Sequence, residues 1–237
     1  MGKAVAGKQP KTGLSTVRRF EAAGFRAWPA SAVHYDGTWV VRLTAGHPAK
    51  RLNSVNPLDP GDVHDLPERI MRAGRRFDAY GRPLTFRLSP LAGRTLTRHL
   101  ENDGWTEFGE SIVMRLDLDD EAVHGAMDQI PMKDMSRFVG AAMETQAADP
   151  ALRPGLSEVI GAIQPDAGLF EVATAAAERG KGHGRRLLLS ALKWARLRGA
   201  RHAWLQVEAD NFAARRLYDT LGFTELYRYH YRRRPKA

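Results

Sequence analysis

The sequence predicts an α/β fold, in which helices flank a β-sheet and the chain is divided into two related halves. Stretches of alternating apolar and polar residues, which indicate strands, recur between stretches with the periodicity of amphipathic helices. A strand–helix–strand unit expected at residues 84–116 resembles a second unit at 203–231, because Gly104-Trp105 and Gly222-Phe223 follow the two helices. This weak internal repeat favours two halves of similar plan.

The composition is that of a folded chain, long enough for one large domain or two small ones. Of the 237 residues, 43% are hydrophobic and none is cysteine, which excludes disulfides, thiolate nucleophiles and cysteine-ligated zinc. Nowhere do about eighteen apolar residues run together, and no apolar segment follows the basic N-terminus. We therefore expect a cytoplasmic protein with no membrane partner and no metal.

The formal net charge of +9 is compatible with a nucleic acid or with a polyanionic small molecule as ligand. The basic residues are mostly arginines spread along the chain, and no known nucleic-acid-binding motif accompanies them. A small polyanion is therefore favoured over nucleic acid. The densest basic run, Arg228 to Lys236, is interpreted as a solvated edge strand and tail.

Residues 1–13 are expected to form a disordered leader, and residues 14–118 the first half. Helices are expected from Ser15 to Gly24, at 62–77 and at 91–100, with strands at 39–43, 84–88 and 110–118. A polar cluster from Arg51 to Pro57 lies in a loop. It is interpreted either as turn structure or as a ligand-facing segment.

The second half is expected to span residues 119–237. Short helices are expected at 122–127, 136–146 and 152–163, and longer ones at 185–198 and 211–221, the last capped by Asp210. Strands are expected at 169–173, 203–207 and 226–231.

The most informative stretch is Arg179 to Gly184, between the strand at 169–173 and the helix at 185–198. Its alternate glycines lack the Cβ atoms that would keep an anion from the main chain, and the first amides of the following helix have no intrahelical partners. A strand, a glycine turn and a helix in this order are typical of phosphate-binding sites. The alternative is a turn that only requires positive φ angles.

The second half resembles the GNAT superfamily of N-acetyltransferases over about residues 112–231. The acetyl-CoA loop of that family, [Gln/Arg]-x-x-Gly-x-[Gly/Ala], is matched by Arg179, Gly182 and Gly184. The downstream pattern of the family is matched by Asn211, Ala214, Tyr218, Gly222 and Phe223. The N-terminal helix, Trp28-Pro29 and the Arg51–Pro57 cluster further resemble a bacterial tandem subfamily whose first half is degenerate.

The resemblance implies a mixed, mostly antiparallel central sheet and transfer of acetyl from acetyl-CoA to a primary amine, by direct attack in a ternary complex. Tyr218 would protonate the departing thiolate as general acid, and Asn211 would hydrogen-bond the pantetheine arm. The residues implied in acetyl-CoA binding are Val172, Thr174, Arg179, Gly180, Lys181, Gly182, His183, Gly184, Arg185, Asn211, Ala214 and Tyr218. The first half has Leu100 at the position of Tyr218 and lacks a glycine loop.

The reaction also requires a general base, because an ammonium group cannot attack the acetyl carbon. Related N-terminal peptide acetyltransferases often place a glutamate where this chain has Gln206, which cannot accept the proton of the amine. Glu171 and Glu208, in the two neighbouring strands, are the candidates. Strand alternation places Glu208 on the same side as Gln206.

Two alternatives to an enzyme stay open: a non-catalytic acetyl-CoA sensor or scaffold, and a nucleic-acid-binding protein. For the enzyme, we expect a small-molecule or peptide amine as acceptor, and the positive charge disfavours polycationic amines. A homodimer is compatible with the sequence.

The family normally inserts a β-hairpin before the strand that leads to the glycine loop. Only residues 164–168 separate the expected helix and strand here, whereas such a hairpin needs about a dozen residues. Either the protein lacks the hairpin or the sequence omits a segment. We favour the omission, because loss of two central strands would expose a sheet edge.

Overall fold

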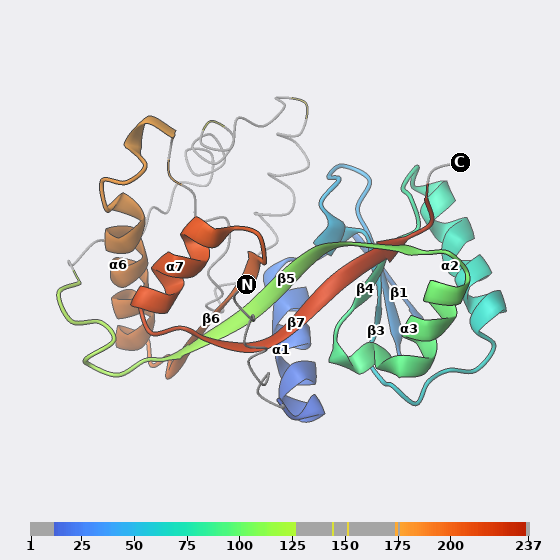
Figure 1. Cartoon of the computed structure of the whole chain (residues 1–237), viewed down its shortest axis with the longest axis horizontal. Helices are drawn as coiled ribbons and strands as arrows, with labels where there is room; N and C mark the ends of the chain where they lie inside the picture. Colours follow the sequence, from blue (N-terminus) through green and yellow to red (C-terminus); the bar gives the residue numbers. More distant parts are fainter. Residues whose placement is uncertain (1–11, 127–143, 145–150, 152–173, 175, 236–237) are drawn as a thin grey trace, which may run out of the picture.

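The computed structural model describes residues 12–126, 144, 151, 174 and 176–235 (Figure 1). Its first part contains α1 (Leu14–Ala27), β1 (Ala32–Asp36), β2 (Trp39–Leu43), the 3-10 helix η1 (Lys50–Leu52), β3 (Ser54–Pro57), α2 (Leu66–Ala79), β4 (Phe86–Leu88), η2 (Pro90–Ala92), α3 (Gly93–Asn102) and β5 (Thr106–Asp117). The second part contains η4 (Ala176–Glu178), α6 (His183–Leu197), β6 (His202–Glu208), α7 (Phe212–Thr220) and β7 (Thr224–Arg233).

Several predicted segments lie outside the described residues. They are the leader apart from Thr12 and Gly13, the helix at 136–146 apart from Glu144, which is helical, the helix at 152–163, the strand at 169–173, and the place of the hairpin. The helix predicted at 122–127 is wrong over its described part, because residues 121–125 form turns and Gly125 has a left-handed φ of 73°.

Among the described residues, seven strands form one sheet in the order β1-β2-β3-β4-β7-β5-β6, and only β3 and β4 of these pair in parallel. The predicted mixed, mostly antiparallel sheet is therefore confirmed. The last strand, β7, lies between β4 and β5, where Arg87 pairs with Tyr231 and Ser111 with Tyr229. The prediction of an edge strand at residues 228–236 is wrong, because β7 is hydrogen-bonded along both of its sides.

The helices divide between the two faces of this sheet (Figure 1). One buried cluster joins α2 and α3 to β2 and β4, and a second joins α6 and α7 to β5 and β6. Both clusters lie on the same face of the sheet. Ile112 of the second cluster lies directly opposite Arg228 on the neighbouring strand, so their two side chains share a face. Arg228 in turn lines a cavity together with residues of α3, which belongs to the first cluster. A third cluster places α1 on the opposite face, against Trp204, Tyr227 and Tyr229.

Part of the Arg51–Pro57 cluster, from Ser54 to Pro57, forms a buried strand, β3, which the sequence does not reveal. Asn53, just before this strand, is also buried. The side-chain nitrogen of Asn56 donates to the carbonyl of Val40 at 3.1 Å, and Asn53 Oδ1 accepts from the amide of Thr44 at 2.8 Å. These bonds satisfy polar groups that would otherwise be costly to bury.

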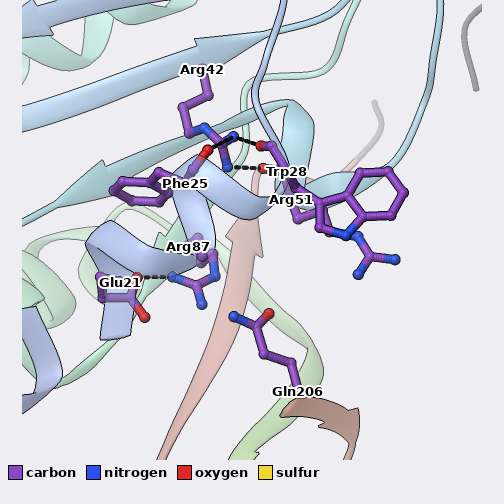
Figure 2. Close-up of a pocket in the computed structure, with 8 residues that line it drawn as sticks. Glu21, Phe25, Trp28, Arg42, Arg51, Arg87 and Gln206 are labelled. Atoms are coloured by element: carbon purple, nitrogen blue, oxygen red, sulfur yellow. Dashed lines mark hydrogen bonds and ion pairs between the residues drawn. The ribbon is translucent and has the colours of Figure 1, made fainter. Parts of the chain in front are cut away.

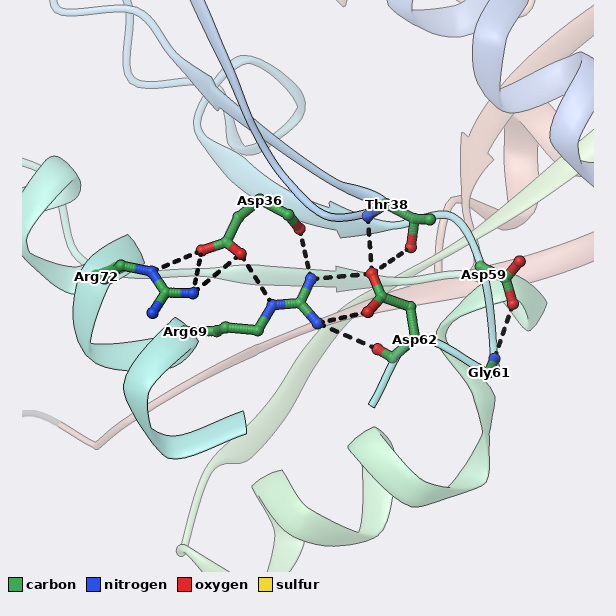
Figure 3. Close-up of polar contacts among 7 residues, drawn as sticks. All are labelled: Asp36, Thr38, Asp59, Gly61, Asp62, Arg69 and Arg72. Atoms are coloured by element: carbon green, nitrogen blue, oxygen red, sulfur yellow. Dashed lines mark hydrogen bonds and ion pairs between the residues drawn. The ribbon is translucent and has the colours of Figure 1, made fainter. Parts of the chain in front are cut away.

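A network of ion pairs fastens α2 to the hairpin of β1 and β2 (Figure 3). The guanidinium of Arg69, a residue only 4% exposed, donates to Asp62 at 2.8 Å and to Asp36 at 3.1 Å. Burial alone would raise the pKa of Asp62, but hydrogen bonds from Arg69 and Thr38 outweigh it and lower the pKa to about 2.

In the described part of the chain, no helix is long and apolar enough to cross a membrane. Within the same residues, no group of three or more histidine, aspartate or glutamate side chains is arranged to hold a metal ion.

Candidate active site

The glycine-rich stretch forms a turn that leads directly into α6. Gly180 and Gly182 have left-handed φ angles of 80° and 77°, which residues with a Cβ atom rarely adopt. The first bond of the α-helical ladder runs from the amide of Arg186 to the carbonyl of Gly182, at 3.1 Å. The amides of His183, Gly184 and Arg185 therefore precede the ladder and have no partner within the helix.

The loop is charged and exposed. Glu178 accepts from Lys181 Nζ at 2.9 Å and lies 3.2 Å from His183 Nε2, and its pKa is lowered, chiefly by the hydrogen bond from Lys181. Arg179 Nε donates to the carbonyl of Thr174 at 3.3 Å. Arg185 is also exposed, so cationic side chains and amide groups of one loop lie together at the start of α6.

The start of α6 lies beside α7. A Cβ atom built on Gly184 would lie 3.5 Å from Leu217 and 3.6 Å from the hydroxyl of Thr174. Asn211, rather than the predicted Asp210, caps α7, because its Oδ1 accepts from the amide of Ala214 at 3.1 Å. No hydrogen-bond partner for the side-chain nitrogen of Asn211 occurs among the described residues.

Tyr218 lies on the inner side of α7. Only 8% of the residue is exposed, and its ring packs edge-on against Phe223 at 5.8 Å between centroids. Burial raises the pKa of the Tyr218 hydroxyl, so the phenol remains protonated at neutral pH. Within the described residues, no group hydrogen-bonds to it.

The two faces of β6 carry different side chains. Leu205 and Val207 pack in the cluster of α6 and α7, whereas Trp204 packs in the cluster of α1 on the opposite face. Gln206 and Glu208 share that opposite face, as strand alternation predicts, and line one cavity. The side-chain oxygen of Gln206 accepts from the hydroxyl of Tyr229 at 2.9 Å, and Glu208 pairs with Lys50 Nζ at 3.3 Å.

We call this hollow the junction cavity, because its walls come from both halves of the sequence. It has a volume of about 420 Å³ and is lined by Ala49, Lys50, Arg51, Ser111, Gln206, Val207, Glu208, Tyr229 and Tyr231. Apart from Arg51, Gln206 and Glu208, the sequence analysis did not single out these residues. The alternating tyrosines at 227, 229 and 231 could have indicated a strand whose one face carries only large side chains and could line a cavity.

The described residues bring most of the predicted site together. Thr174 lies beside Arg179 and Gly184 of the loop, and Gly184 lies beside Leu217 of α7. This helix carries Ala214 and Tyr218 and is capped by Asn211. Glu208 lies across the sheet from them, in the junction cavity. Glu171 and Val172 lie outside the described residues.

Residues 96–223 match the sequence model of the acetyltransferase (GNAT) family. Because this match covers more than half of the chain, the protein belongs to that family of acyltransferases, whose members act on amine acceptors.

Along the chain, the protein is 24% identical over 254 aligned residues to the uncharacterized N-acetyltransferase YobR of Bacillus subtilis (strain 168), covering 92% of this chain and 99% of the relative. Its fold resembles a GCN5-related N-acetyltransferase from Kribbella flavida, with a TM-score of 0.64, 17% identity, and coverage of 93% of this chain and 96% of that one. It also resembles a tandem GNAT protein from the clavulanic acid biosynthesis pathway, with a TM-score of 0.57, 15% identity, and coverage of 90% and 86%.

Proposed function

We propose that this acyltransferase binds acetyl-CoA at the Arg179–Gly184 loop and α7, and transfers the acetyl group to a primary amine by direct attack. The proposal rests chiefly on one observation. A loop with two left-handed glycines opens α6, and Gly184 at the start of α6 lies beside Leu217 of α7, the helix that carries the acid candidate Tyr218 and is capped by Asn211.

The loop offers the groups that a pyrophosphate requires. Amides of Gly182, His183 and Gly184 would donate to phosphate oxygens, as at other helix N-termini. Lys181 would move from Glu178 to the ligand, because a phosphate presents more negative charge than one exposed carboxylate. The side-chain nitrogen of Asn211 would donate to an amide carbonyl of the pantetheine arm while its oxygen continues to cap α7.

Tyr218 would donate a proton to the leaving group, and Glu208 would accept a proton from the amine. The amine nitrogen forms a bond to the acetyl carbon, and the bond between that carbon and sulfur breaks. Tyr218, protonated at neutral pH, gives its proton to the sulfur. The nitrogen loses its second proton as the amide forms, and this proton would return to the Tyr218 phenolate, directly or through water. An ammonium with a pKa of about 10 must first lose a proton, and Glu208 would accept it directly or through one water.

A second function is favoured by one feature of the same site. Gln206 cannot act as a base, and Glu208 is already paired with Lys50. If neither Glu208 nor the untested candidate Glu171 accepts the proton, the chain would bind acetyl-CoA without turnover and serve as a sensor or scaffold.

A thiol-release assay with acetyl-CoA over a panel of amines separates the two functions. We expect turnover with at least one amine, and a fall in kcat of about 100-fold in Glu208→Gln, the lower range for loss of a general base. Asp219→Asn, which removes an exposed carboxylate from α7, is the charge-matched control and should keep wild-type kcat. Binding of acetyl-CoA without turnover on any amine would favour the sensor instead.

A further inference from the structure

The junction cavity has a polar floor shared by three strands. Ser111 of β5 pairs across the sheet with Glu208 of β6 on one side and with Tyr229 of β7 on the other. All three line the cavity, and the small serine leaves a hollow between the carboxylate and the phenol. A small polar molecule that entered this hollow would lie over Ser111 of β5 and contact Glu208 of β6.

The wall of the cavity is cationic and comes from η1 of the first half. Lys50 reaches over a bulge in β5, where Gly109 has a left-handed φ of 62° and its missing Cβ atom would lie 2.8 Å from Lys50 Nζ. The ammonium lies 3.3 Å from Glu208 and 5.2 Å from the ring centroid of Tyr231. Next to it, Arg51 stacks on the ring of Trp28 at 4.4 Å.

A smaller cavity behind this wall adds more positive charge (Figure 2). It shares Arg51 and Gln206 with the junction cavity and is also lined by Arg42, Arg87 and Glu21. Arg87 is paired with Glu21. Arg42, only 3% exposed, donates to the backbone carbonyls of Phe25, Trp28 and Arg51.

Among the described residues that line the two cavities, the cationic side chains (Arg42, Lys50, Arg51 and Arg87) outnumber the carboxylates (Glu21 and Glu208). Desolvation and the nearby charge of Arg87 lower the pKa of Arg42 to about 10, as expected in a positive field of low polarity. Such a field attracts anions and repels a second positive charge on a ligand.

We infer that the acceptor amine carries a carboxylate, as an amino acid does, which binds beside Lys50 and Arg51 while the amino group lies toward Glu208. This inference rests on the proposed acetyltransferase function. The separation of 3.3 Å between Lys50 Nζ and Glu208 places a cation and an anion within the span of one small zwitterion. A carboxylate would gain charge-assisted hydrogen bonds from the wall, whereas a polyamine would not.

The first test compares free amino acids with their carboxamides as acceptors in the thiol-release assay. We expect kcat/KM to be at least about ten-fold higher for the preferred amino acid than for its amide, the effect of one charge-assisted hydrogen bond. In Lys50→Gln, KM for the acid should rise and this ratio should approach one, and Lys50→Arg should restore the preference. Arg75→Gln, which removes an exposed charge from α2, is the control and should keep the wild-type ratio.

A binding measurement separates failure of the inference from failure of the proposed function. Calorimetry with N-acetyl-amino acids, the expected products, and with their amides requires no turnover. Tighter binding of the acids than of the amides, weakened in Lys50→Gln, supports the inference. If amides or polyamines are acetylated as well as amino acids, the inference is wrong although the acetyltransferase stands. If no amine is acetylated but the acids still bind more tightly than the amides, the proposed reaction is wrong and the carboxylate site stands; if neither result is obtained, both are wrong.

Discussion

The helices α3 and α7 occupy similar strand–helix–strand units but differ where chemistry is expected. Each ends in a left-handed glycine, with φ angles of 76° at Gly104 and 85° at Gly222. In each, the amide of the following aromatic residue donates to the carbonyl of the residue four before the glycine, at 3.0 Å: Trp105 to Leu100, and Phe223 to Tyr218. The helix ends are therefore built in the same way.

The N-terminal ends of α3 and α7 differ. Eleven residues before each glycine, α7 has its cap, Asn211, whereas α3 has Gly93, which has no side chain. A Cβ atom on Gly93 would lie 2.8 Å from Pro60, so the first half fills the space beside this helix start with its own chain. Leu100, fully buried, also replaces Tyr218. The same plan therefore serves packing in the first half, whereas in the second half we propose that it serves ligand binding.

The largest effects on activity and on stability are expected from substitutions at the equivalent positions 218 and 100. Tyr218→Phe should lower kcat by about 100-fold or more, because no proton reaches the leaving sulfur, with little change in acetyl-CoA affinity. Leu100→Ala should instead lower the free energy of unfolding by about 2–5 kcal/mol and lower the Tm. Kinetics and thermal unfolding of both variants test this; a Tyr218→Phe enzyme with wild-type kcat would break the comparison.

A smaller effect concerns two ion pairs: the pair of Arg69 and Asp62 in the first half is largely buried, whereas the pair of Lys181 and Glu178 at the loop is exposed. The lowered pKa of Asp62 means that its contribution to stability is complete above about pH 4 and is lost as the pH falls toward 2. We expect the loss to be about 2 kcal/mol, measured by denaturant unfolding between these pH values.

In Asp62→Asn this part of the pH dependence should disappear, although the variant is less stable throughout because Arg69 loses a buried partner. If the free energy of unfolding falls with pH equally in the wild type and in Asp62→Asn, the ion pair of Asp62 does not cause the pH dependence.

The smallest effect is expected at the loop itself. Glu178→Gln should change the free energy of unfolding by less than about 0.5 kcal/mol, because its ion pairs are exposed. Acetyl-CoA affinity should rise, by at most about five-fold, since Lys181 is released for the phosphate. Glu68→Gln on α2 serves as the control; a weaker affinity in Glu178→Gln but not in Glu68→Gln would contradict this role of the loop.

The parts of this protein that are local in sequence could be predicted, and those that depend on distant pairing could not. The glycine loop, α6 and the Asn211–Tyr218 helix were all indicated by residues close together in the chain. The strand β3 was not, because buried Asn53 and Asn56 look like loop residues until their backbone partners are known. The central place of β7 also depends on β4, which is far away in sequence.

The two sides of the candidate site differ in how far apart their residues lie in the sequence. The proposed acetyl-CoA side is one loop and one helix, so its motif is visible in the sequence. The proposed acceptor side combines Lys50, Ser111 and Tyr229, which only the sheet brings together, and whose spacing along the chain has no pattern of its own.

The central claim is that only the second half binds acetyl-CoA, and the stoichiometry of binding tests it most directly. Calorimetry should give one acetyl-CoA per chain, with affinity lost in Gly182→Ala, where the added methyl group lies in the loop that would hold the pyrophosphate. Gly199→Ala, at the other end of α6 with a similar left-handed φ of 87°, carries a similar backbone strain of about 1–2 kcal/mol and should keep the affinity. Two sites per chain, or a Gly182→Ala protein that binds like the wild type, would contradict the account.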